Sequence, residues 1–221
     1  MARPAKKRGS VGAKKHAGRK AGAATERWQA ADRRRHIIIE SARLFATKGF
    51  DATSMREIAS RTGVLAGSLY YYFESKEELF VEVHTEGMKV LTEAVDSAIA
   101  GLDDPWDQLE AAAAAHCRAL VESREMLVLV VPTLPAGLAP YRSQLIRQRD
   151  EYERKFGRII DRLNLHPSID RDVMRLHILG ALNWVQVWYR PGSRLSITEV
   201  AKQIIGLLRP EHRVMAEPQH A

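Results

Sequence analysis

The chain has 221 residues, of which 45% are hydrophobic and 28% are charged, a balance that is typical of a globular protein. A single cysteine, Cys117, excludes an internal disulfide and a cysteine-based metal cluster. The longest apolar runs, such as residues 126–131, are far shorter than the roughly 20 residues that span a bilayer. Disulfide scaffolds, fibres and membrane-spanning proteins are therefore excluded.

The net charge of +7 is concentrated at the start of the chain. Residues 1–20 contain eight basic side chains and no acid, whereas residues 21–221 contain 26 basic and 27 acidic side chains, a formal charge of −1. Residues 1–25 are mostly Ala, Gly, Lys and Arg, which predicts a disordered basic arm. This arm is either a solubilising tail that contacts polyanions without specificity or a segment with a specific role on DNA. No apolar segment follows its charges, so we expect no secretory signal and a cytoplasmic protein.

From about residue 28 the apolar spacing is helical, and no convincing strand pattern occurs, which predicts an all-α fold. The first helix is expected over residues 28–48, where Gly49 ends it. Thr53 or Ser54 caps a second helix, which ends near Thr62.

The remaining helices follow in chain order after a turn at Gly63. They are expected over residues 65–73, 76–100, 106–123, 140–164, 170–189 and 196–208. Segments rich in Gly and Pro separate the later helices, at residues 101–105, 132–140, 166–167 and 190–192. Three capping boxes mark helix starts, at Ser54-x-x-Glu57, Ser75-x-x-Glu78 and Ser196-x-x-Glu199.

Three short helices with a tight turn between the second and the third form a helix-turn-helix, whose third helix lies in the DNA major groove. Spaced apolar residues would hold the three helices together: Ala42, Phe45, Ile58, Ala59, Val64, Leu69 and Phe73. The full pattern reads RHIIIESARLFATKGFDATSMREIASRTGV over residues 35–64 and LAGSLYYYFESKEEL over residues 65–79. It resembles the N-terminal domain of the TetR family of one-component transcriptional repressors.

This resemblance implies an all-helical homodimer, in which two DNA-binding heads are carried by a larger C-terminal domain with a small-molecule pocket. Its expected partners are a palindromic double-stranded DNA operator, a small-molecule effector and a second copy of the chain. The last two helices of each copy would form a four-helix dimer seam. The expected organisation is a basic arm (1–25), a helix-turn-helix domain (26–80), a ligand-binding and dimerisation domain (81–209) and a flexible tail (210–221).

Hydroxyl groups and one lysine make up most of the expected DNA-binding site. Ser68, Tyr70 and Tyr72 carry hydroxyls that suit phosphate oxygens and base edges, and Lys76 lies in the first turn of a helix, where free N–H groups attract phosphate. The resemblance adds Arg56 as a base or phosphate contact and makes Tyr70 and Lys76 anchors on the DNA backbone. At least two of the three consecutive tyrosines are expected to reach DNA, because neighbours on a helix point about 100° apart.

The C-terminal half shows no catalytic constellation. His116 and Cys117 point about 100° apart on a helix, and the eight histidines show no paired metal spacing, so we expect no enzyme, no cofactor and no metal. Apolar helices with embedded polar groups favour a small-molecule cavity. The pocket candidates are His116, Tyr152, His177, Asn183, Trp184 and Trp188, with Trp106, Met126, Leu129 and Tyr141 as further wall residues. Trp184 and Trp188 share a helix face, which is pocket, core or dimer seam.

Residues 183–200 are similar to the C-terminal part of TetR-type regulators of fatty-acid, branched-chain and steroid breakdown, many of which sense acyl-CoA thioesters. The similarity implies a bulky amphiphilic effector with an anionic head. Six arginines on the helix over 140–164 would suit CoA phosphates, but interleaved acids favour an ion-paired, solvated face.

Two alternatives remain open at this point. One is an architectural DNA-binding protein without a ligand response, and the other is a CoA-thioester enzyme, for which the sequence offers no nucleophile–base pair.

Overall fold

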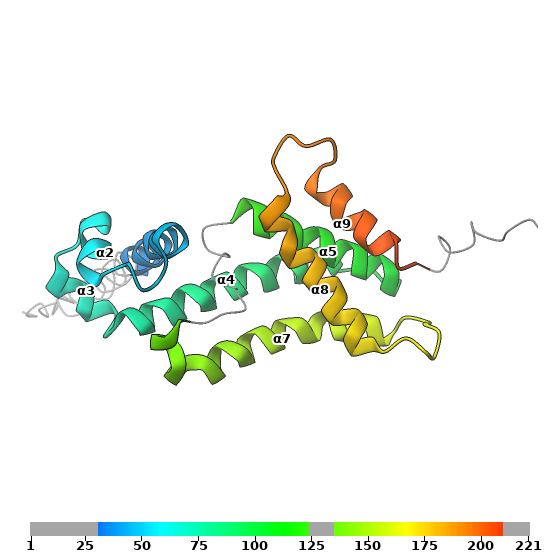
Figure 1. Cartoon of the computed structure of the whole chain (residues 1–221), viewed down its shortest axis with the longest axis horizontal. Helices are drawn as coiled ribbons and strands as arrows, with labels where there is room; N and C mark the ends of the chain where they lie inside the picture. Colours follow the sequence, from blue (N-terminus) through cyan, green and yellow to red (C-terminus); the bar gives the residue numbers. More distant parts are fainter. Residues whose placement is uncertain (1–30, 124–134, 210–221) are drawn as a thin grey trace, which may run out of the picture.

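The structure is a computed structural model, and it describes residues 31–123 and 135–209. Within these ranges every regular element is helical, so the predicted all-α fold is confirmed (Figure 1). Residues 31–48 form the described part of the first helix. The elements that follow are α2 (Met55–Thr62), α3 (Ala66–Tyr72), α4 (Lys76–Ile99), α5 (Pro105–Glu122), the 3₁₀ helix η1 (Ala136–Tyr141), α7 (Arg142–Asp161), α8 (Arg171–Trp188) and α9 (Ile197–Gly206). The predicted basic arm and C-terminal tail lie outside the described residues.

Serine side chains start three of these helices, as the capping-box patterns predict. At α9 the box is complete, because the Ser196 hydroxyl accepts from the Glu199 N–H and the Glu199 carboxylate accepts from the Ser196 N–H at 2.7 Å. At α2 the Ser54 hydroxyl accepts from the Glu57 N–H at 3.2 Å. The Glu57 carboxylate, however, pairs with the Lys48 ammonium at 2.5 Å. The side chain thus joins two helices instead of closing the box.

The start of α4 shows the same division of roles. Ser75 accepts from the Glu78 N–H at 3.0 Å, while the Glu78 carboxylate accepts from the Glu74 N–H at 2.6 Å. The turn between α2 and α3 is made by Gly63, whose φ of 67° lies in the left-handed region. This conformation is easy only for glycine, as the sequence predicts.

Two apolar cores hold the chain together. The first joins residues 31–48, α2, α3 and the first half of α4, and its centre is a cluster of Phe45, Phe50 and Phe80 with ring centres 5.3–5.6 Å apart. We call this part the head. The second core surrounds α5, which packs against α4, α7, α8 and α9. Because α4 contributes to both cores, it connects the head to the C-terminal domain (Figure 1).

The head core also contains side chains from beyond α5. Leu138 of η1 and Leu145 of α7 are buried in it, and Tyr141 packs against it. The Cα of Gly137 lies so near the head that an added Cβ would lie 3.5 Å from the Phe50 ring. The sequence predicts a break at residues 132–140, but the structure forms η1 from Ala136 and begins α7 at Arg142.

No helix in the described ranges is long and apolar enough to cross a membrane. The same residues bring no three His, Cys, Asp or Glu side chains together as metal ligands.

Candidate functional site

The helix α3 is buried along one side and open along the other. Leu69 is fully buried in the head core, whereas Ser68 is exposed and Tyr70 is 53% exposed. Arg56, the second residue of α2, is also exposed. The structure therefore leaves three of the five predicted DNA-contacting side chains free to meet a ligand.

Of the three consecutive tyrosines, Tyr71 is the most open, at 87% exposure, and it is absent from the predicted set. Tyr72, which is in that set, is half-buried against the head core, and its ring is perpendicular to that of Tyr71, with the ring centres 5.6 Å apart. Helix geometry explains the difference, because Tyr71 lies about 200° around α3 from the buried Leu69. Measuring each position from Leu69 would have selected Tyr71 from the sequence alone.

Lys76 is held inside the head by three contacts. Its ammonium donates to the carbonyl oxygens of Phe50 and Thr53 at 2.8 and 2.9 Å, and it lies 4.3 Å from the centre of the Phe50 ring. An ammonium has three N–H donors, and these two hydrogen bonds use two of them. The anchoring of the turn at residues 49–54 is a role that sequence reasoning missed.

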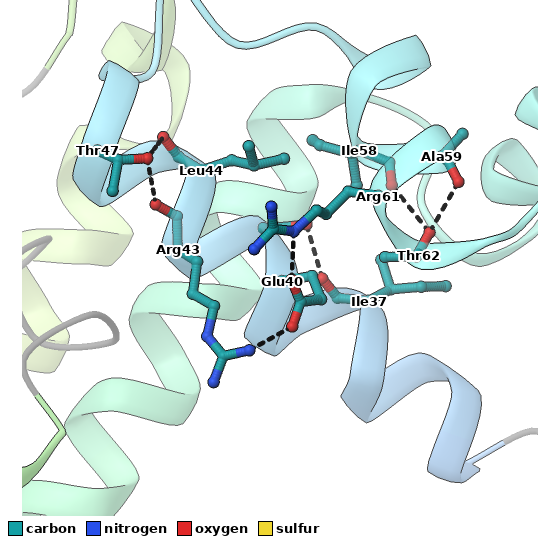
Figure 2. Close-up of polar contacts among 10 residues, drawn as sticks. Ile37, Glu40, Arg43, Leu44, Thr47, Ile58, Ala59, Arg61 and Thr62 are labelled. Carbon is teal, nitrogen blue, oxygen red and sulfur yellow. Dashed lines mark hydrogen bonds and ion pairs between the residues drawn. The ribbon is translucent and has the colours of Figure 1, made fainter.

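A buried carboxylate fixes α2 against the first helix. Glu40 accepts from Arg43 at 2.5 Å on its own helix and from Arg61 of α2 at 2.9 Å, as Figure 2 shows. The hydrogen bond from Arg61 is the main reason that the pKa of Glu40 lies below its ordinary value, and Arg43 adds to the effect. The two arginines are half-exposed while the Glu40 side chain is buried. The network therefore fixes the position of α2 against the first helix within the head.

In the C-terminal domain, three predicted pocket residues from three helices meet. His116 of α5 bonds through Nδ1 to the Tyr152 hydroxyl of α7 at 2.6 Å and through Nε2 to Asn183 Oδ1 of α8 at 3.2 Å. Burial lowers the pKa of His116 to about 4, so the imidazole is neutral at pH 7. Burial also raises the pKa of Tyr152 above its ordinary value. We call these three residues the buried triad.

The cysteine beside this triad is buried. Burial raises the pKa of the Cys117 thiol to about 12, so it is protonated at pH 7. Since the thiolate is the nucleophilic form, His116 and Cys117 do not make a catalytic dyad.

The other three predicted pocket residues lie away from the triad. His177 is exposed, and Trp184 and Trp188 are 62% and 48% exposed on the outer side of α8. The two tryptophans belong to an apolar stripe on that side, made by Val173, Leu176, Trp184, Val187 and Trp188. Trp188 also lines a groove of about 360 Å³ between the end of α8 and α9. In the described chain this stripe lacks a covering element, which favours the dimer-seam interpretation of the two tryptophans.

The further wall candidates are dispersed. Trp106 packs against the C-terminal core and Tyr141 against the head core, while Met126 and Leu129 lie outside the described residues. Of the arginines on α7, Arg149 pairs with Asp150 and Glu153 at 3.1 and 3.3 Å. This pairing agrees with the ion-paired surface that the interleaved acids predict.

Two family models match the chain. The model for bacterial regulatory proteins of the tetR family matches residues 37–83, and that for a tetracyclin repressor-like C-terminal domain matches residues 102–210. The HTH-type transcriptional repressor KstR2 of Mycobacterium tuberculosis (strain ATCC 25618 / H37Rv) is 28% identical over 188 residues, which are 81% of this chain and 92% of the repressor.

Solved structures share the fold along most of the chain. The TetR family transcriptional regulator PfmR from Thermus thermophilus is 29% identical with a TM-score of 0.65, over 78% of this chain and 96% of PfmR. AibR in complex with isovaleryl coenzyme A and operator DNA is 24% identical with a TM-score of 0.69, over 79% of this chain and 97% of AibR.

Proposed function

Because the chain belongs to the TetR family of bacterial regulatory proteins, we propose that it is a homodimeric transcriptional repressor which binds a palindromic operator and is released by a small-molecule effector. The observation that carries the proposal is the presence, on one chain, of an open α3 in the head and a separate buried polar triad in the C-terminal domain. The first is a surface for DNA, and the second supplies polar groups for a ligand.

The DNA-binding role rests on the exposed side of the head. Arg56, Ser68 and Tyr70 face outward, and Tyr71 joins them. Two such heads in a dimer would present their α3 helices about 34 Å apart, the length of one DNA turn. The half-sites of a palindrome have the same spacing, so each α3 would read one half-site.

The dimer rests on the apolar stripe of α8. Five large apolar side chains on that side are about half or more exposed, and Leu207 just beyond α9 is 77% exposed. Burial of apolar area of this kind drives permanent association of identical chains. Helices α8 and α9 of two copies would then make a four-helix seam.

The effector role rests on the buried triad and its position. His116, Tyr152 and Asn183 bring three helices together at neutral hydrogen-bonding groups within an apolar core. Such groups orient a ligand in a largely apolar pocket. We assign the effector to the acyl-CoA thioesters, and AibR, which was solved with isovaleryl coenzyme A and operator DNA, supports the assignment through its shared fold.

Coupling between effector binding and DNA binding would pass through α4 and the start of α7, since these two helices both contribute to the head core. A ligand that prefers a different spacing of the two heads would release DNA, and a ligand indifferent to spacing would not.

The test is a gel-shift assay with the full-length protein and a duplex that it selects from a random double-stranded DNA library. Titration of the complex with short and long acyl-CoAs, free CoA and free acids should release DNA with one acyl-CoA class. Arg56→Ala should change the DNA sequence that the protein selects. Arg154→Ala, which removes an equal charge from an exposed position of α7, is the control and should leave that sequence unchanged. Failure to select any sequence would contradict the regulator, and release by none of these compounds would contradict the effector class.

A further inference from the structure

The side chain of Leu65, the residue before α3, is left exposed by the described part of the chain. Its side chain is 79% exposed and makes no capping hydrogen bond. Only its carbonyl oxygen is used, as the acceptor for the N–H groups of Ser68 and Leu69 at 2.9 and 3.1 Å. Ser, Thr, Asp or Asn would cap the helix better and leave less apolar surface in water. A leucine here needs an explanation outside the chain.

Gly67, two residues further along and the second residue of α3, is also unexplained by the fold. It lies inside a helix and is absent from the glycines with positive φ, which are Gly49, Gly63, Gly101 and Gly192 among the described residues. A Cβ added at Gly67 would meet nothing within 4 Å. Glycine within a helix lowers its stability relative to alanine, and one role that offsets this cost is close approach of the backbone to a ligand.

The segment that carries these two residues contains no charged side chain. Residues 65–72 contain no Lys, Arg, Asp or Glu. The exposed part of α3 therefore lacks the arginine or lysine forks that read guanine. It offers a branched aliphatic side chain, a bare stretch of backbone and hydroxyl groups.

We propose that Leu65 selects thymine by packing on its C5-methyl group in the major groove, and that Gly67 allows α3 to come close enough for this contact. The inference rests on the proposed DNA-binding function and deepens it by naming what is read. In a helix-turn-helix the first residues of the recognition helix contact base edges, and the thymine methyl is the apolar group that the major groove presents. Leu65 is the one large side chain of the four residues that begin this segment, Leu65 to Ser68.

The experiment uses the full-length protein and the duplex selected as above, with each thymine replaced in turn by deoxyuridine, which lacks only the methyl group. Replacing one particular thymine in each half-site should lower the affinity of the protein for the duplex about fourfold per methyl group removed. This factor corresponds to the burial of one methyl group. Leu65→Ala should bind the thymine and the deoxyuridine duplexes equally, and Leu65→Met, which keeps an apolar chain of similar length, should retain most of the difference.

Gly67→Ala provides an independent test, because it should raise the stability of the protein while it lowers the affinity for DNA. It should raise the melting temperature, because alanine favours the helix, and should weaken DNA binding at least about tenfold, because its methyl occupies the space of closest approach. The matched control is Gly157→Ala in α7, whose added Cβ meets an Arg175 side-chain carbon at 3.6 Å, an ordinary contact. It should leave DNA affinity unchanged.

Each outcome decides one of the two proposals. If the protein selects a sequence but deoxyuridine has no effect at any position, or if Leu65→Ala keeps the preference for thymine, the readout by Leu65 is overturned while the regulator stands. If no sequence is selected, the regulator itself fails, and the readout fails with it.

Discussion

The ammonium of Lys76 lies 2.8 Å from the carbonyl oxygen of Phe50 and 4.3 Å from the centre of its ring. The first residue of α4 is thereby tied to the turn that precedes α2. The sequence predicts Lys76 as a phosphate anchor, and the structure shows that it also links two segments of the head.

Lys76→Ala should lower the free energy of unfolding by about 1–3 kcal/mol, because it removes two hydrogen bonds from a charged donor. It should also weaken binding to all DNA sequences alike, since the whole head is loosened. Urea denaturation and gel shifts measure the two effects. Lys89→Ala, which removes an exposed lysine paired with Glu93 at 3.9 Å, is the control and should change neither by a measurable amount. A Lys76→Ala protein of unchanged stability would disprove the linking role.

Glu40→Ala should destabilise the head by about 1–2 kcal/mol, a moderate loss because Arg43 and Arg61 can still reach water. The lowered pKa of Glu40 means that the unfolded chain takes up its proton first as the pH falls. Its stabilisation is therefore complete above the ordinary pKa of 4.5 and is lost as the pH falls through the folded value. Thermal melts between pH 7 and pH 3 should show a smaller acid-induced loss for Glu40→Ala than for the unmodified chain, and parallel curves would contradict this.

His116 should make the C-terminal domain sensitive to mild acid. Its pKa is about 4 in the folded protein and 6.5 ordinarily, so between these values the unfolded state binds more protons and stability falls as the pH falls. Between pH 7 and pH 5 the loss should be about 2 kcal/mol in urea denaturation. His84, whose pKa burial also lowers, acts in the same direction. His116→Gln should remove most of the loss, while the exposed His166→Gln should retain it.

Trp184→Arg should separate the proposed dimer. The change places a charge on the apolar stripe and should raise the dissociation constant of the dimer by at least about 30-fold, as for a central interface tryptophan. Light scattering after size exclusion should then give the mass of one chain where the unmodified protein gives twice that mass. Tyr71→Arg alters a still more exposed aromatic residue, on the head, and should remain dimeric. A Trp184→Arg protein that stays dimeric would place the seam elsewhere.

The starts of α2, α4 and α9 and the turn at Gly63 were predictable because local chemistry sets them. Gly63 takes its positive φ, and Ser54, Ser75 and Ser196 each cap the helix that their pattern marks. The second halves of two capping boxes were not predictable, because Glu57 finds Lys48, nine residues away, and Glu78 finds the backbone of Glu74.

The site was predictable only in part, since a helical pattern shows which residues share a face but not what that face meets. His116, Tyr152 and Asn183 are predicted as pocket residues, and the structure brings them together because polar groups on apolar faces must find partners. Trp184 and Trp188 were predicted for the same pocket, but both side chains are exposed on the outer side of α8. The contacts of Lys76 span more than 20 residues and depend on the tertiary fold.

The burial of Leu138 and Leu145 in the head core bears on how this protein can be recombined with its relatives. A hybrid that transfers only residues 31–83 onto another C-terminal domain would leave the head core without its side chains from η1 and α7. Residues 136–145 must be transferred with the head for its core to stay complete. The exchangeable unit of this protein therefore consists of two separate stretches of the sequence that share one core, and no single cut in the chain separates it from the rest.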